Sequence, residues 1–328
     1  MKHSYHSVPL TKILSSSCRD FFCFRELEIF DFEDGLNIIF GNNGSGKSTS
    51  VRMISAALSP NTSHDWDFTT RNDSAKGSLI EIRFIVEGKI CYLRRVIVQG
   101  TTTDLHLYIE TGNEMEFLRD NEVVRFLAKL KPINVIKANN FDKRRFWITF
   151  SDDSTPKDKT STEFFKLIKK IMSQKKNTTD NNLVLLIEEI ESSIDSFYEE
   201  HVFGSSLRYK DLPGGYSRLW KIIGDLGRSN ADFAASDSSK VYIIDQADQY
   251  LRRAEFQILL DILDLLCAEY DLQFILTSSH RLPTNSNKHN YIDISRIETP
   301  KQYSASTSYT LNQVNKSFIF KNPPYGSR

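Results

Sequence analysis

The sequence predicts an α/β fold with a mainly parallel core sheet, and three observations support this prediction. Near the N-terminus, a short apolar strand leads into a glycine-rich loop and a helix. Toward the C-terminus, two further apolar strands alternate with helical patterns. Between these halves lie a run of period-two segments and a run of helical segments. Strands that alternate with helices are typical of a parallel sheet covered by helices, so we expect an antiparallel β subdomain and a helical lobe inserted into that core.

Composition limits the classes of function. The chain has 328 residues, with 42 basic and 42 acidic side chains. Because these charges cancel, binding to nucleic acid or to a membrane surface would require a local patch. No apolar run reaches the roughly 20 residues of a membrane span, and the N-terminus lacks the apolar core of a signal peptide. We therefore expect a cytoplasmic protein that makes no contact with a membrane.

The N-terminal half is expected to contain two strands, a helix and a meander. FRELEIFDFE (24–33) alternates in period two, and LNIIF (36–40) is a short apolar run. The helical pattern STSVRMISAAL (48–58) ends before Ser59-Pro60. Period-two runs separated by glycine-containing turns over 78–118 predict an antiparallel meander.

The C-terminal half is expected to complete the core. EVVRFLAKL (122–130) reads as a helix, INVIKA (133–138) as a strand, and RRAEFQILLDILDLLCAEY (252–270) as a long helix. KVYIID (240–245) and LQFILTSSH (272–280) read as buried strands. We expect one domain over 1–328 with four parts: a nucleotide-binding core (1–60 and 205–290), an antiparallel β subdomain (78–118), a helical lobe (119–204), and C-terminal strands and tail (291–328).

Residues 41–48, GNNGSGKS, match the phosphate-loop pattern G-x-x-x-x-G-K-[ST]. Glycines let backbone N–H groups turn toward phosphate oxygens at the start of a helix, whose dipole favours anions. Lys47 can reach the β- and γ-phosphates, and the Ser48 hydroxyl can bind magnesium. A chance glycine-rich turn is the alternative, but the buried strand before the loop and the striped helix after it favour nucleotide binding. The predicted nucleotide-binding residues here are Gly41, Asn42, Asn43, Gly44, Ser45, Gly46, Lys47, Ser48 and Thr49.

Three further segments are candidates for the same site. Asp245 ends the VYII strand, where it would hold magnesium, although an N-cap role is the alternative. His280 ends the next buried strand, so we expect it at the same sheet edge, where it could sense the γ-phosphate or be structural. Gly214 and Gly215 in LPGGY (212–216) open a helix, either as a simple turn or as a loop that binds nucleotide held by a second subunit.

The order of these motifs resembles the RecF/SMC group of ABC-type ATPases. The resemblance covers residues 24–60 and 205–282, and the meander over 78–118 matches the antiparallel subdomain of that group. It implies a compact P-loop NTPase head of ABC type, without a coiled-coil arm, that binds ATP and Mg²⁺. It also implies an ATP-dependent homodimer or higher oligomer, with nucleotides held between the P-loop and the LPGGY signature loop. The chain is similar to compact ATPases of bacterial DNA repair and anti-phage defence systems.

Three positions depart from the pattern of that group. Gln246 stands where many members carry a catalytic glutamate, so general-base assistance worth roughly 10²–10⁴-fold is missing. Gln246 can still orient a water molecule, and His280 can partly compensate. Pro213 replaces the phosphate-contacting serine of the signature loop, and Arg252 replaces an aspartate of the subunit-contacting loop. We expect good MgATP binding and slow hydrolysis. The glutamine at position 246 has three open explanations: a natural slow switch, a family that never used this carboxylate, or an introduced substitution.

The sequence leaves two classes of binding partner open, DNA and an effector protein. Basic and aromatic residues alternate in KANNFDKRRFW (137–147), a pattern that can hold phosphates and stack bases, or form a solvated loop with core aromatics. The same segment holds Asn139 and Asn140, one of which we assign to the glutamine-loop position. The resemblance favours an ATPase of DNA repair or defence that binds DNA. The alternative is an ATP-dependent scaffold that holds or releases a nuclease or toxin partner, since no nuclease motif is recognisable in the sequence.

Overall fold

A computed structural model gives the fold of the chain. It describes residues 8–63, 77–112, 114–131, 134–137, 222, 239–249, 251, 253–279 and 289–295. The chain divides into two compact units, which we describe separately. The first unit comprises Met1–Lys12, Glu33–Gly41 and Leu130–Ile292, and the second comprises Ile13–Phe32, Asn42–Lys129 and Asp293–Arg328.

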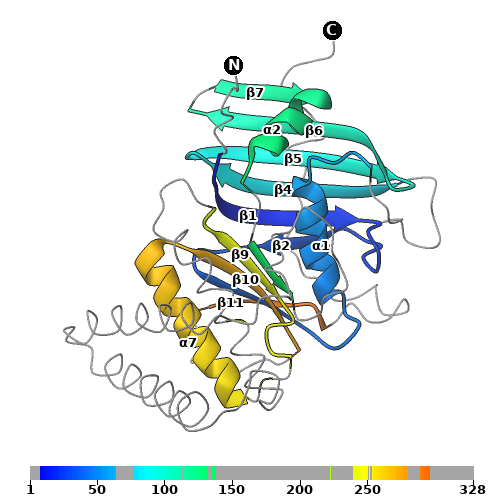
Figure 1. The fold of residues 1–328 in the computed structure, drawn as a ribbon. Helices are drawn as coiled ribbons and strands as arrows, with labels where there is room; N and C mark the ends of the chain where they lie inside the picture. Colours follow the sequence, from blue (N-terminus) through cyan, green and yellow to red (C-terminus); the bar gives the residue numbers. More distant parts are fainter. Residues whose placement is uncertain are drawn as a thin grey trace, which may run out of the picture. The chain divides into compact units, whose positions relative to one another are not determined.

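The first unit contains a five-stranded sheet in the order β11-β3-β10-β9-β8, of which Figure 1 labels β9, β10 and β11. Its strands are β3 (Leu36–Phe40), β8 (Asn134–Lys137), β9 (Val241–Asp245), β10 (Gln273–Ser278) and β11 (Asn290–Asp293). The pairs β3/β10, β10/β9 and β9/β8 are parallel. Helix α7 (Arg253–Tyr270) packs against β3 and β10. The predicted parallel core is therefore confirmed, and its strands β3, β9 and β10 are buried runs because a parallel sheet is covered on both faces.

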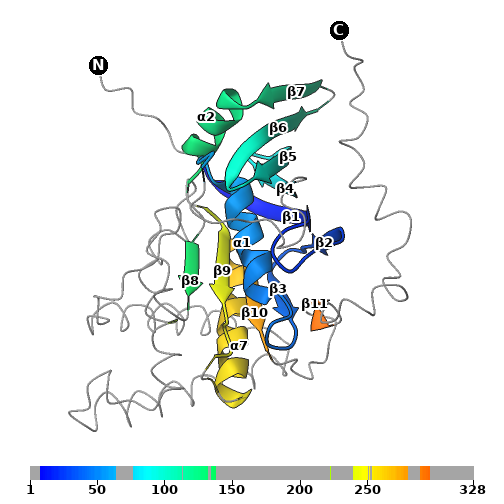
Figure 2. The same cartoon turned by 90° about the vertical axis from the view of Figure 1, so that its right-hand side faces the viewer.

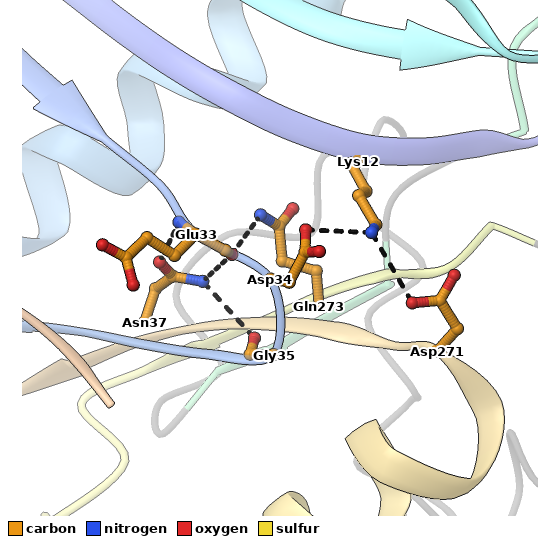
Figure 3. A network of polar contacts seen from close by, with 7 residues as sticks. All are labelled: Lys12, Glu33, Asp34, Gly35, Asn37, Asp271 and Gln273. Carbon is orange, nitrogen blue, oxygen red and sulfur yellow. Dashed lines mark hydrogen bonds and ion pairs between the residues drawn. The ribbon is translucent and has the colours of Figure 1, made fainter. Parts of the chain in front are cut away.

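A polar network closes the amino-terminal edge of this sheet (Figure 3). Asn37 is completely buried on β3, and its amide donates to the Glu33 and Gly35 carbonyls while its oxygen accepts from the Glu33 N–H. The Gln273 amide also donates to the Glu33 carbonyl. Every polar atom of the Asn37 amide is thus paired, as a buried amide requires. This network fixes the turn that leads into β3.

A lysine joins two carboxylates at the same edge. Lys12 Nζ lies 2.9 Å from an oxygen of Asp34 and 3.6 Å from an oxygen of Asp271 (Figure 3). Burial lowers the pKa of Lys12, but the two carboxylates outweigh this effect and raise its pKa above the ordinary value. The lysine therefore stays charged and ties the turn before β3 to the turn before β10.

The second unit contains a six-stranded sheet in the order β2-β1-β4-β5-β6-β7. Its strands are β1 (Leu10–Arg19), β2 (Glu28–Asp31), β4 (Ser78–Val86), β5 (Lys89–Val98), β6 (Thr101–Thr111) and β7 (Glu114–Arg119). The pairs β4/β5, β5/β6 and β6/β7 are antiparallel, which confirms the meander predicted over 78–118. The pair β1/β2 is also antiparallel. Helix α1 (Lys47–Leu58) packs against β4 and β5. Figure 2 shows α2 (Asn121–Lys129) along β6 and β7.

The structure shortens one predicted strand, adds one that was not predicted and confirms a third. The strand expected over 24–33 is limited to Glu28–Asp31, because Phe21 and Phe24 pair across a tight turn. β1 was not predicted; its residues show no clear period, and it lies between β2 and the more distant β4 in the sheet. β8 (Asn134–Lys137) confirms the strand predicted over 133–138 and belongs to the parallel sheet. In the part of the chain that the structure describes, no helix combines the length and apolarity needed to span a bilayer.

A buried carboxyl in the antiparallel sheet makes the stability of the fold depend on pH. Burial raises the pKa of Glu28 from its ordinary value of 4.5 to about 7, and the Glu26 carboxylate adds to this shift. The folded state therefore holds the Glu28 proton more tightly than the unfolded chain does. This contribution to stability is fully present below about pH 4.5 and is lost as the pH rises toward 7.

Glu28→Gln should stabilise the protein at pH 8 and change little at pH 5. The neutral amide removes a buried charge that only the wild type carries at the higher pH, an effect of at most about 3 kcal/mol. Thermal unfolding of both proteins at the two pH values measures it. An equal change in melting temperature at pH 5 and pH 8 would contradict the assignment of this carboxyl.

Candidate nucleotide-binding site

The predicted phosphate loop connects β3 to α1. Gly44 (φ 88°) and Gly46 (φ 101°) adopt left-handed conformations, which side-chain-bearing residues rarely adopt. The Ser45 N–H donates to the Asn42 carbonyl at 3.2 Å, and the Ser50 N–H donates to the Gly46 carbonyl at 2.9 Å. The loop thus closes on itself and passes directly into the first turn of α1.

The start of α1 fits an anionic ligand. The helix has no side-chain cap and no acidic residue in its first turn, so its positive end is not neutralised locally. Lys47 is buried, and its ammonium group donates to the Asn42 carbonyl at 2.8 Å. The Ser45 hydroxyl is also buried and has no hydrogen-bond partner among the residues that the structure describes. A phosphate group would accept hydrogen bonds from such donors, so the residues present fit a nucleotide.

A tight hairpin before β2 packs against this loop. The Phe21 and Phe24 backbones exchange hydrogen bonds of 2.8 and 2.9 Å. A Cβ atom at Gly46 would lie 2.7 Å from both the Cys23 sulfur and the Phe24 ring. Gly46 is therefore required for two reasons, its positive φ and the close approach of the hairpin.

Gly46→Ala should weaken nucleotide binding by at least about tenfold, because the added methyl must push the hairpin or the loop out of place. Gly44→Ala is the matched control, since Gly44 has a similar φ but no atom lies within 4 Å of the place that its added methyl would occupy. Equilibrium binding of a fluorescent ATP analogue to both variants compares them. Equal losses would mean that backbone strain alone matters and that the hairpin contact does not.

The carboxyl-terminal edge of the parallel sheet brings together several polar residues. Asp245 ends β9, and the register of β9 with β10 places it beside Thr277. The Thr277 hydroxyl donates to Asp245 Oδ1 at 2.6 Å. The Gly41 N–H donates to the Ser278 carbonyl at 3.3 Å, so the first residue of the phosphate loop lies at this same edge. Ligands of open parallel sheets bind at such an edge.

Gln246 follows Asp245 in a strained turn. Its φ of 55° lies in the left-handed region, and its N–H donates to the Thr277 hydroxyl at 2.6 Å. The Ala247 N–H donates to the Thr277 carbonyl at 2.8 Å. Asp248 is buried and accepts a hydrogen bond from the Ser279 N–H at 2.7 Å. Strain of this kind is concentrated at functional sites.

A family model of the AAA domain matches residues 17–266, which is most of the chain. The chain belongs to the AAA domain family. The match includes the phosphate loop and the Asp245 strand, and it confirms the predicted resemblance to RecF/SMC-like ABC-type ATPases. The similarity to defence systems in particular stays a prediction. No curated protein matches the chain.

Solved structures of SMC heads are similar to this AAA domain. The SMC head bound to the C-terminal winged-helix domain of ScpA shares 16% identity with a TM-score of 0.46. The head with an extended coiled coil bound to ScpA, from Pyrococcus furiosus, shares 14% with a TM-score of 0.49. The head from Thermotoga maritima shares 12% with a TM-score of 0.45. Each alignment covers 82% of this chain and 89% of the other.

The structure describes only some of the site residues that the sequence predicts. The structure describes the residues of the phosphate loop, Asp245 and Gln246. The other predicted positions lie outside the described residues; they are Asn139, Asn140, Pro213, Gly214, Gly215, Arg252 and His280. Two polar residues of the site edge, Thr277 and Asp248, were missed. Each is a polar residue at or after the end of an apolar strand, a signal that could have identified them.

Proposed function

We propose that this AAA domain is an ABC-type ATPase of the RecF/SMC type that binds MgATP and hydrolyses it slowly. The observation that carries the proposal is the phosphate loop. In it a buried Lys47 and a Ser45 hydroxyl that has no partner among the described residues adjoin a helix start without a side-chain cap. These features supply the donors and positive charge that a polyphosphate requires.

Each residue has a role in this proposal. Residues 41–49 surround the phosphates, and Lys47 contacts the β- and γ-phosphates. Ser48 and Asp245 hold Mg²⁺ through oxygen atoms, which are the ligands that this cation prefers. The cation would neutralise charge on the phosphates. Gln246 orients the attacking water but accepts no proton from it, and His280 contacts the γ-phosphate.

Slow ATP hydrolysis follows from the chemistry of the Gln246 amide. A glutamine side chain is neutral and does not act as a general base near pH 7, whereas a carboxylate does. The bound ATP would therefore persist, and with it any assembly that ATP supports. The chain would then act as a switch whose ATP-bound state is long-lived.

We extend the proposal to assembly and partners. With MgATP, two chains associate so that Gly214 and Gly215 of one contact nucleotide on the other. The resulting dimer or higher oligomer acts in the cytoplasm, in DNA repair or anti-phage defence, and binds DNA or an effector protein. The second candidate, a scaffold that holds or releases a nuclease or toxin, is favoured by the amide at Gln246, since a scaffold benefits from slow turnover. Salt-dependent retention of DNA would favour the first, and a co-purifying effector the second.

Analytical ultracentrifugation with and without MgATP tests the assembly. We expect nucleotide-dependent self-association of the wild type, and its loss in Gly215→Asp, because a carboxylate at this position would repel phosphate. Gly88→Asp is the matched control, since Gly88 lies in an open turn where an added Cβ atom would meet nothing within 4 Å. Assembly of Gly215→Asp as readily as the wild type would mean that LPGGY is only a turn.

A further inference from the structure

One side chain contacts both Asp245, which ends β9, and Gln246, which follows it. Thr277 is completely buried at the end of β10. Its hydroxyl lies 2.6 Å from Asp245 Oδ1 and 2.6 Å from the Gln246 nitrogen. The hydroxyl–carboxylate distance is at the short end of the usual range for an O–H donor, and the nitrogen–hydroxyl distance is slightly shorter than is usual for an N–H donor, so both contacts are close.

The direction of these two bonds follows from their chemistry. A backbone N–H only donates, so Gln246 must use a lone pair of the hydroxyl. The hydroxyl has one proton, and an ionised carboxylate only accepts, so that proton goes to Asp245. Thr277 therefore donates to the carboxylate and accepts from the turn at the same time. No other assignment satisfies all three groups.

The two bonds restrict two different motions. Because the Thr277 side chain is β-branched, its χ1 angle is restricted, and its two hydrogen bonds hold the hydroxyl between Asp245 and Gln246. The bond to Oδ1 limits rotation of the Asp245 carboxylate. The bond from the Gln246 N–H supports a φ of 55°, which a residue with a side chain adopts only when its surroundings enforce it.

We propose that Thr277 is a positioning residue for the divalent cation, acting through the carboxylate of Asp245, and for the main chain of Gln246. The inference rests on the proposed function, because it assumes that Asp245 holds Mg²⁺. A buried threonine that only supports the sheet would influence stability but not the effect of the cation on nucleotide binding. The two roles are therefore separable by experiment.

The test uses the full chain and a fluorescent ATP analogue, with affinities measured in EDTA and in excess Mg²⁺. Thr277→Val keeps the shape and removes the hydroxyl, while Thr277→Ser keeps the hydroxyl. We expect the increase in affinity on adding Mg²⁺ to be about tenfold smaller in Thr277→Val than in the wild type. This is the effect of one lost hydrogen bond to a charged group. Affinity in EDTA should change less than about twofold, and Thr277→Ser should restore most of the gain.

Melting temperatures identify the folded variants, and Thr277→Ala replaces Thr277→Val if the valine protein does not fold. A folded hydroxyl-free variant that retains the full gain from Mg²⁺ would overturn the proposal and leave the proposed function intact. A wild type that binds the analogue equally well in EDTA and in Mg²⁺ would overturn both, because Asp245 would then hold no cation. These two failures are distinguished by the wild-type titration alone.

Discussion

Lys47→Ala should abolish measurable MgATP binding. The Lys47 ammonium is buried in the loop, where it donates to the Asn42 carbonyl, and phosphate oxygens would replace that neutral acceptor with a charged one. Hydrogen bonds to charged groups contribute about 1.5–3 kcal/mol each, and this ammonium can make more than one. We therefore expect a loss of at least about 100-fold in affinity, measured by isothermal titration calorimetry.

The control for this variant is Lys12→Ala. Lys12 is another largely buried lysine, but its partners are Asp34 and Asp271 at the opposite, amino-terminal edge of the parallel sheet. Its removal should lower stability and leave the affinity for ATP unchanged at a temperature where the protein is folded. Unchanged affinity in Lys47→Ala would show that residues 41–48 do not form the phosphate site.

Gln246→Glu should raise the rate of single-turnover ATP hydrolysis by one to several orders of magnitude. A carboxylate at this position can accept a proton from the attacking water, while Asp245 keeps its place beside Thr277. The expected gain lies in the range of roughly 10²–10⁴ for general-base catalysis. ATP-dependent assemblies should become shorter-lived for the same reason. Rapid-quench measurement of product formation, with ATP binding measured in parallel, records both effects.

Gln99→Glu is a closely matched control, because Gln99 is also a glutamine in the left-handed conformation, with φ 48°, but lies in the exposed turn between β5 and β6. This variant should hydrolyse ATP as slowly as the wild type. If Gln246→Glu binds ATP and shows no gain over Gln99→Glu, the proton acceptor lies elsewhere, or Pro213 and Arg252 leave the composite site inactive.

Much of the fold could be predicted because its signals are local. β3, β9 and β10 are continuous apolar runs, and the meander alternates in period two, so each is apparent within a short window. The phosphate loop is similarly local, since strand, glycines, lysine and helix are adjacent in sequence. Asp245 could be identified from its place at the end of an apolar strand.

The parts that could not be predicted depend on long-range pairing. β1 contains three consecutive serines and no regular alternation, and it is a strand because β2 and β4 flank it. Asn37 looks out of place in the run LNIIF, yet its partners include the distant Phe274 carbonyl and the Asn290 amide. Thr277 reads as an ordinary strand residue until the register with β9 places it beside Asp245. In each case the conformation of a segment or the role of a side chain depends on residues that are distant in the sequence.

The identity of the nucleotide recovered from the protein shows whether the site binds ATP and hydrolyses it slowly. The full chain is incubated with ATP and Mg²⁺, separated rapidly from free nucleotide, denatured and analysed by chromatography. We expect retention of stoichiometric nucleotide that is mainly ATP, because the phosphate loop binds it and Gln246 does not promote its hydrolysis. Recovery of no nucleotide, or of ADP alone after the shortest incubation, would contradict an ATP-binding site with slow hydrolysis.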